Sequence, residues 1–382
     1  MSTLRMGESD HKRGRLRRIV VRVGWLAVGL ALALLAAELV VTWIHGPTVR
    51  FPRRVIEAPW GLRYNQPGAR YHHHSADVDV AFRINAQGMR ADRDYGYEKP
   101  AGVRRIICLG DSFTAGYEVE QQETFASVLE RGLASRGYRV EVLNAGVSGF
   151  STAEELLYLE RELWRYQPDV VVLSFFANDL ADNVRTGLFK LEDGKLVAAA
   201  ERYVPLGRLG NFLNTNFIFN FLSERSNLMA LLKERVTMQI KSDMVAENLE
   251  RDGPGGRAEL FDAAAYERRL TASLLERLLA WCRERRTSLV VQSIPEVIPA
   301  GPSLLDKFPY AEFPTDQAGL QFVRCEELLT PWLGKELLYW NRSHFHWTPF
   351  THHLSGEHLA QVIDEARLLG EPGAPEEGNP PR

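Results

Sequence analysis

The sequence predicts an α/β fold, in which helices cover both faces of a central parallel sheet, preceded by one membrane-spanning helix. From residue 104 onwards, short runs rich in valine, isoleucine and leucine alternate with longer amphipathic stretches. Such alternation produces parallel strands, because each helix returns the chain to the same end of the sheet. The predicted elements are strand 104–110, helix 122–136, strand 138–144, helix 152–166, strand 169–175, helix 262–286, strand 288–294 and helix 351–369.

The membrane helix is predicted by an apolar run over residues 23–44, which only Glu38 and mildly polar residues interrupt. A run of about 20 residues suffices to cross a bilayer. The basic residues before it are Lys12, Arg13, Arg15, Arg17, Arg18 and Arg22. Since none follows immediately, the positive-inside rule predicts a cytoplasmic tail over 1–22, a signal anchor in the cell membrane, and a periplasmic or extracellular body. A cleaved signal peptide is the alternative, because the uninterrupted apolar part ends at Ala37.

Length and composition allow one substantial core. The chain has 382 residues, of which 45% are hydrophobic and 25% charged, and its formal net charge is −3. This charge, with no long basic stripe outside the N-terminus, argues against a nucleic-acid partner. The cysteines Cys108, Cys282 and Cys325 predict buried free thiols, although a Cys282–Cys325 disulfide would suit an exported protein.

Polar residues follow three of the predicted strands at the point where each strand ends. They are Asp111 and Ser112 after the first strand, Gly149 after the second, and Asn178 and Asp179 after the third. Ligand sites in parallel sheets lie at these carboxyl ends. A serine on a glycine-flanked turn after a strand is placed as a nucleophile, which then needs a base and oxyanion donors elsewhere in the chain.

Taken in order, Ser112, Gly149, Asn178 and His346 resemble the four blocks of the SGNH (GDSL-type) hydrolase family, over roughly residues 80–370. The resemblance implies a flavodoxin-like three-layer α/β/α fold and a serine esterase without metal or cofactor, which hydrolyses or transfers an acyl group through an acyl-serine intermediate. It implies that Ser112 is the nucleophile and His346 the base. The backbone N–H groups of Ser112 and Gly149 and the Asn178 amide would form the oxyanion hole, supported by Asp111 and Asp179.

The sequence departs from the family at the acid that orients the histidine. The family usually carries an aspartate two or three residues before the histidine, where this chain has His344 and Ser343. Three explanations stand: Asn341 or a backbone carbonyl holds the histidine in a working dyad, a distant acid replaces the aspartate, or catalysis is lost. The candidate distant acids are Asp306, Asp316 and Glu336. We favour a dyad or a substitute acid, and His344 is an alternative base.

The resemblance also divides the chain after the anchor. Residues 45–100 are expected to pack on the core as a lead-in, with a strand at 78–84 and an exposed triplet His72-His73-His74. The hydrolase domain spans 101–370, and its insertion at 181–261 supplies aromatic residues. These form a lid or an acyl-chain groove or, as we favour, bury the insertion against the core. The acidic tail 371–382 is predicted to be disordered.

Substrate identity does not follow from the motifs. The expected partner is an ester substrate, such as an acylated glycan or a lipid, with membrane attachment through the N-terminal helix. Phe176, where the family usually has glycine, predicts a narrow acyl pocket. The alternatives to an esterase are a cell-envelope polysaccharide O-acyltransferase or deacetylase, and a catalytically silent binding domain. The histidines near the C-terminus lack acidic or cysteine ligands at suitable spacing, so we expect no metal there.

Overall fold

The core is a five-stranded parallel sheet with strand order β13-β10-β7-β5-β6. The computed structural model describes residues 4–45, 50, 54–205, 207–252, 262–298 and 303–372. The strands are β5 (Arg104–Leu109), β6 (Val140–Asn144), β7 (Val170–Phe176), β10 (Ser288–Ile294) and β13 (Leu320–Arg324). Along the chain this is the 2-1-3-4-5 order of flavodoxin-like folds, so the predicted fold class is confirmed.

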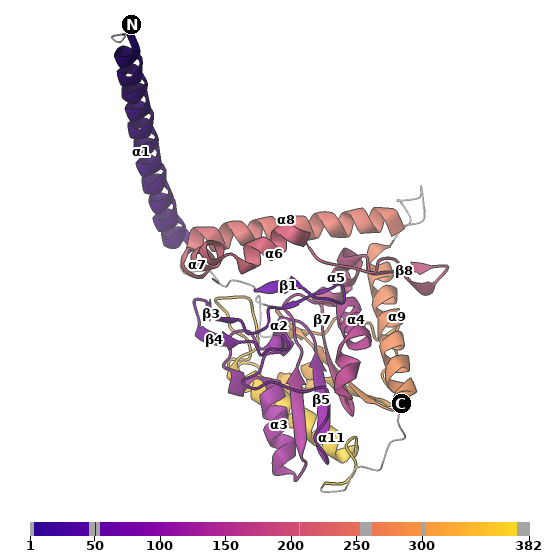
Figure 1. The fold of residues 1–382 in the computed structure, drawn as a ribbon. Helices are drawn as coiled ribbons and strands as arrows, with labels where there is room; N and C mark the ends of the chain where they lie inside the picture. Colours follow the sequence, from indigo (N-terminus) through magenta and orange to yellow (C-terminus); the bar gives the residue numbers. More distant parts are fainter. Residues whose placement is uncertain are drawn as a thin grey trace.

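Helices cover both faces of the sheet (Figure 1). The helices α3 (Phe125–Ser135) and α11 (Pro349–Glu365) pack against one face, and α4 (Thr152–Arg161) and α9 (Ala263–Glu284) against the other. Alternate residues of β5 enter opposite cores: Ile106 and Cys108 face α3 and α11, whereas Ile107 and Leu109 face α4 and α9. Because successive strand residues point to opposite faces, a continuous apolar run is what a sheet buried on both sides requires.

The predicted elements differ from the observed ones mainly at their ends. The predicted helix 152–166 is α4 followed by a separate 3-10 turn, η2 (Leu163–Tyr166). The edge strand β13 was not predicted, and neither was the hairpin of β11 (Glu296–Ile298) and β12 (Ser303–Leu305). All three cysteines are buried and free, so the structure contains no Cys282–Cys325 disulfide. Residues 373–382 of the predicted tail lie outside the described residues.

The lead-in consists of two hairpins that lie against the body of the protein. They are β1 (Val55–Glu57) with β2 (Arg63–Asn65), and β3 (Arg70–His74) with β4 (Asp79–Arg83). Tyr71 and Phe82 of the second hairpin share a small apolar core with Tyr117, which follows β5. His73 points into this region and its side chain is fully buried. The expectation of an exposed histidine triplet is therefore wrong for His73, because strand alternation turns the middle residue inward.

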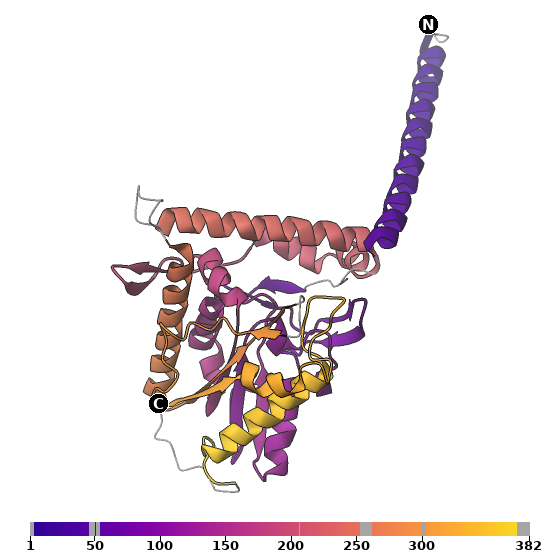
Figure 2. The ribbon, with the colours of Figure 1, turned by 180° about the vertical axis from the view of Figure 1, so that it is seen from behind.

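The insertion forms a helical layer across the carboxyl edge of the sheet (Figures 1 and 2). After α5 (Asn178–Thr186) and the hairpin β8 (Phe189–Glu192) and β9 (Lys195–Ala198), it contains α6 (Gly207–Thr215), α7 (Phe217–Arg225) and α8 (Asn227–Asp252). We expected the aromatic residues of the insertion to be buried against the core, and this expectation is wrong for three of them. Phe212, Phe217 and Phe221 are 61%, 79% and 44% exposed, and only Phe219 of the four aromatics lines a cavity beneath the helices.

The N-terminal helix α1 (Leu4–His45) projects away from the body and meets the first turn of α8 (Figure 1). Its stretch Arg15–Ile44 is long and apolar enough to cross a membrane, as a signal sequence would also be. The Glu38 carboxylate accepts hydrogen bonds from the Ser226 hydroxyl at 2.7 Å and from the backbone N–H groups of Asn227 and Leu228 at 2.7 and 2.9 Å. Glu38 thereby satisfies donors at the N-terminus of α8 that would otherwise lack partners.

Candidate active site

Ser112 is held at the carboxyl end of β5 by a tight turn. Gly110 has φ 152°, and a Cβ at this residue would lie 2.1 Å from the Thr114 hydroxyl, so only glycine fits. The Asp111 carboxylate accepts a hydrogen bond from the Phe113 N–H at 2.9 Å and caps the one-turn helix α2 (Ser112–Ala115). The strand and the cap together fix the backbone on both sides of Ser112, which is half-buried.

His346 lies beside Ser112, as the sequence predicts. Its Nε2 is 2.9 Å from the Ser112 Oγ. The His346 side chain is 8% exposed, and the rings of Phe113 and Tyr117 pack edge-on against the imidazole, with centroids 5.2 and 5.7 Å away. The next residue, Trp347, is fully buried and anchors this segment in the core. The histidine is thus in hydrogen-bonding range of the serine and has little freedom to rotate away.

The acid that faces His346 is Glu118, which the sequence analysis did not identify. The His346 Nδ1 lies 3.3 Å from the Glu118 Oε2, on the opposite side of the ring from Ser112. The Ser343 hydroxyl donates to the same oxygen at 2.8 Å, and the His73 Nε2 lies 3.2 Å from the Glu118 Oε1. Burial opposes ionisation of Glu118, but hydrogen bonds from His346 and His73 outweigh it and hold its pKa well below the usual range. Glu118 is therefore a buried carboxylate.

The backbone of Glu118 is strained. Its φ is 69°, in the left-handed region, which costs a residue with a side chain about 1–2 kcal/mol. The Glu118 carbonyl accepts a hydrogen bond from the Trp340 Nε1 at 3.1 Å, so the C-terminal loop holds both the backbone and the side chain. Strain of this kind concentrates at functional sites, where surrounding contacts enforce it.

The other orienting groups considered from the sequence lie elsewhere. Asn341 is exposed and lines a separate cavity with Leu338 and Tyr339. Asp306 accepts hydrogen bonds from Ser293 and Tyr310 at 2.6 and 2.5 Å. Asp316 and Glu336 are exposed. The acid comes instead from the turn that follows Ser112, which is more than 200 residues before His346 in the sequence.

His344 and Ser343 stand in the sequence where the family has its aspartate, but neither takes the place of that acid in the structure. Ser343 contacts the acid, not the histidine ring. His344 is exposed, with its ring centroid 6.1 Å from that of His346 and its Nε2 3.7 Å from the Glu234 Oε1 on α8. Of the two histidines, only His346 has a hydrogen bond to Ser112 in the structure.

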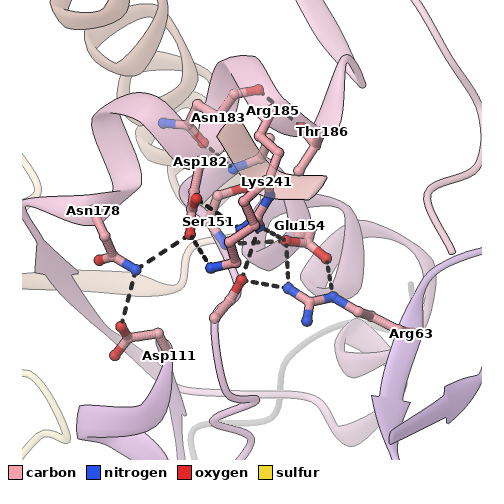
Figure 3. Close-up of polar contacts among 12 residues, drawn as sticks. Arg63, Asp111, Ser151, Glu154, Asn178, Asp182, Asn183, Arg185, Thr186 and Lys241 are labelled. Carbon is pink, nitrogen blue, oxygen red and sulfur yellow. Dashed lines mark hydrogen bonds and ion pairs between the residues drawn. The ribbon is translucent and has the colours of Figure 1, made fainter. Parts of the chain in front are cut away.

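Asn178, one of the predicted oxyanion donors, lies in a cluster of charged side chains next to Asp111 of the serine turn (Figure 3). The Asn178 Nδ2, at the start of α5, is 3.4 Å from both the Asp111 Oδ2 and the Asp182 Oδ2. Its Oδ1 is buried without a hydrogen-bond partner among the described residues. Gly149 has φ 68°, and its carbonyl accepts hydrogen bonds from Arg63 and, at 3.0 Å, from Arg185.

Three cations and several carboxylates surround these donors (Figure 3). Arg63 pairs with Glu154 at 2.9 Å, Arg185 pairs with Asp182 at 2.7 Å, and the Lys241 Nζ of α8 lies 3.4 Å from Asp182. Because both arginines also hold the Gly149 carbonyl, they fix the direction of the peptides around it. The cluster is thus a rigid support for the loop after β6.

Burial raises the pKa values of other carboxyl groups of the site. It raises the pKa of Asp111 to about 6, against hydrogen bonds from Phe113 and Asn178 that favour the charged form. Burial, and to a lesser extent repulsion from neighbouring carboxylates such as Asp111 and Glu154, raise the pKa values of Asp179 and Glu155 well above the ordinary range. Asp179 accepts a hydrogen bond from the Phe176 N–H at 3.1 Å and so shapes the turn that presents Asn178. Among the described residues, no group of three or more His, Cys, Asp or Glu side chains is placed to hold a metal.

Residues 108–321 match the model of the GDSL-like Lipase/Acylhydrolase family. The chain belongs to this family. The match includes Ser112, Glu118, Gly149 and Asn178 but ends before His346, so the geometry alone places the histidine of this GDSL-like protein.

Named relatives share only part of their length with this GDSL-like chain. An arylesterase of Vibrio mimicus is 35% identical over 75 residues, 20% of this chain and 38% of that protein. The esterase TesA of Pseudomonas aeruginosa is 30% identical over 79 residues, 21% of this chain and 39% of that protein. The chain thus spans about two fifths of the length of these curated relatives. The solved structure of the esterase EstA from Pseudoalteromonas sp. covers 69% of this chain and 98% of its own, with 15% identity and a TM-score of 0.36.

Proposed function

We propose that the protein is a serine esterase that uses Ser112 as nucleophile and His346 as general base and acid. Glu118 positions the His346 ring and stabilises its positive charge. The observation that supports this is the continuous row from the Ser112 Oγ through both ring nitrogens of His346 to the Glu118 carboxylate, at 2.9 and 3.3 Å. In this row the Nδ1–H donates to Glu118, which leaves Nε2 free to accept the serine proton.

The reaction follows from this tautomer. As the Ser112 Oγ forms a bond to the acyl carbonyl carbon, its proton passes to the His346 Nε2, and the positive imidazolium is stabilised by the Glu118 carboxylate. The negative charge on the carbonyl oxygen is met by the backbone N–H groups of Ser112 and Gly149 and by the Asn178 amide. When the bond to the leaving alcohol breaks, Nε2–H protonates that oxygen. Water then attacks the acyl-serine by the same steps in reverse and releases the acid.

A serine-directed fluorophosphonate and p-nitrophenyl butyrate test the proposal together. We expect the full chain to be labelled and to hydrolyse the ester, and both activities to vanish in Ser112→Ala while the melting temperature stays nearly unchanged. A folded wild type that neither reacts with the probe nor turns over any ester would reject the esterase proposal in favour of a silent binding domain. Faster ester consumption with an added polysaccharide acceptor, and acylation of that acceptor, would instead identify an acyltransferase.

We also propose that α1 stays attached as a membrane anchor. The contact between Glu38 and the N-terminus of α8 supports this, because a signal peptide that is cleaved off would leave those α8 donors unsatisfied. Mass spectrometry of the protein from the membrane fraction tests the anchor. An N-terminus that begins beyond residue 44 would reject it, and recovery of peptides from residues 15–44 would support it.

A further inference from the structure

We propose that the insertion helices form a site for the acyl chain of the substrate, which makes a medium-chain acyl ester of a polar alcohol the preferred class. This inference rests on the proposed esterase function. A cavity of about 370 Å³ lies between the insertion helices and the lead-in hairpin. Its apolar wall includes Val55 and Ile56 of the hairpin and Leu213, Phe219, Ile240 and Met244 of the insertion helices. This size and lining are typical of a small-molecule pocket.

Three of the four cations that line the cavity gather at the proposed oxyanion hole, while the fourth, Lys233, lies two turns of α8 away from Lys241. Arg63, Arg185 and Lys241 line it there. The Lys241 Nζ lies 3.6 Å, and the Arg63 Nη2 3.8 Å, from the point that a Cβ on Gly149 would occupy. Lys241 also connects through Asp182 to the Asn178 amide, in contacts of 3.4 Å each (Figure 3). An ester whose carbonyl oxygen sits at Gly149 and Asn178 would therefore extend its acyl chain into the apolar part.

A second cavity, of about 400 Å³, lies on the other side of α8, and most of the residues that line it are polar or charged. The helix residues Lys233, Thr237 and Lys241, one turn apart, line both cavities. The second cavity also contains Ser343 and His344, which places it next to His346. Because His346 must protonate the leaving oxygen, the alcohol lies on the histidine side of the serine. The more polar cavity therefore takes the alcohol, and the apolar one takes the acyl group.

The charges agree with this assignment. Arg185 and Arg63 are 1% and 13% exposed at the side chain, so they are positioned and weakly screened. Glu154 and Asp182 balance the charges of Arg63 and Arg185, and the third cation, Lys241, lies nearest to Gly149, where the carbonyl oxygen of an ester would become negative in the transition state. Phe176, which the sequence suggested would narrow the acyl pocket, packs against Phe113 with ring centroids 4.6 Å apart. Phe176 is not among the residues that line the cavity beneath the insertion helices.

A chain-length series on the full protein in lipid nanodiscs tests the inference. We expect kcat/KM to rise from p-nitrophenyl acetate to octanoate, since each buried methylene contributes up to about fourfold. Ile240→Trp fills the cavity and should lower the octanoate-to-acetate ratio at least about tenfold. Leu213→Trp, on the opposite wall, should do the same if Ile240→Trp fails to fold. Gln239→Trp is the matched control, because this exposed residue of α8 is outside both linings. Ratios that stay equal in all folded variants would overturn the proposal.

A binding measurement separates this inference from the esterase proposal. Dansyl-labelled undecanoic acid should bind Ser112→Ala with enhanced fluorescence, and Ser112→Ala/Ile240→Trp should lose this binding, whether or not the wild type is an esterase. Ser112-dependent hydrolysis without chain-length preference and without binding would reject the acyl site but keep the esterase. Binding without any hydrolysis would keep the acyl site and reject the esterase. Equal binding to the double variant would assign the probe to the nanodisc lipid or another surface and overturn the site.

Discussion

Replacing Glu118 by glutamine should lower kcat by about 10³- to 10⁴-fold with little loss of stability. The carboxylate is fully buried, and its Oε2 lies 3.3 Å from the His346 Nδ1. At this separation and an effective dielectric constant near 20, the attraction between carboxylate and imidazolium is about 5 kcal/mol. Since each 1.36 kcal/mol is a factor of ten in rate, loss of the charge in the transition state corresponds to about 10³- to 10⁴-fold. The neutral amide retains the volume and can still accept one hydrogen bond.

The assay is hydrolysis of p-nitrophenyl butyrate, with the melting temperature measured on the same samples. Glu118→Asp should recover part of the rate, because it keeps the charge and aspartate tolerates a positive φ better than most residues. Asp306→Asn is the matched control: it neutralises an acid bonded to Ser293 and Tyr310, and kcat should change less than about twofold. A folded Glu118→Gln enzyme that loses less than about tenfold would refute the argument and leave His346 as part of a dyad.

Three further predictions concern the same domain. His346→Ala should abolish turnover, whereas His344→Ala should change kcat less than about tenfold; the reverse order would identify the other base. Asn178→Ala should lower kcat about 10²- to 10³-fold, as expected for a lost oxyanion donor, and an effect on KM alone would exclude that role. Burial lowers the pKa of His352 to about 3, and its Nδ1 accepts from the Phe125 N–H at 3.2 Å. The unfolded chain, with a histidine pKa of about 6.5, therefore binds the extra proton first, and stability falls by about 2 kcal/mol between about pH 8 and pH 5. His352→Asn should flatten this slope in urea titrations, and an unchanged slope would contradict it.

The sequence predicts the parts of the fold that depend on local patterns. The strands β5, β7 and β10 are continuous apolar runs because both of their faces are buried, and they were located to within a residue or two. The strand β13 was not recognised. Its five residues, Leu-Gln-Phe-Val-Arg, form an edge that is only partly buried, so they lack the apolar run that identified the others. Its place is decided by parallel pairing with β10, which is a long-range contact.

The site also contains residues that local sequence patterns predict and one that they do not. Ser112 and Asn178 follow strands that the sequence identifies, so their meeting at one edge of the sheet could be predicted. Glu118 could not, because nothing in its neighbourhood distinguishes it from Glu120, two residues away, which caps a 3-10 turn. What distinguishes Glu118 is distant in sequence: His73 from the lead-in hairpin and Ser343 from the C-terminal loop both contact its carboxylate.

The backbone at Glu118 explains how an acid can occupy this turn. Helix α2 ends at its C-cap Gly116, and two residues later Glu118, with φ at 69°, directs its side chain to His346. Glycine would adopt this angle without the cost of about 1–2 kcal/mol, but it would leave Nδ1 of His346 and the Ser343 hydroxyl without their shared acceptor. Each buried donor left without an acceptor costs about 1–3 kcal/mol, which equals or exceeds the strain. The contacts from two remote segments therefore stabilise the strained turn, and the strained turn supplies the acid that the C-terminal block of this chain lacks.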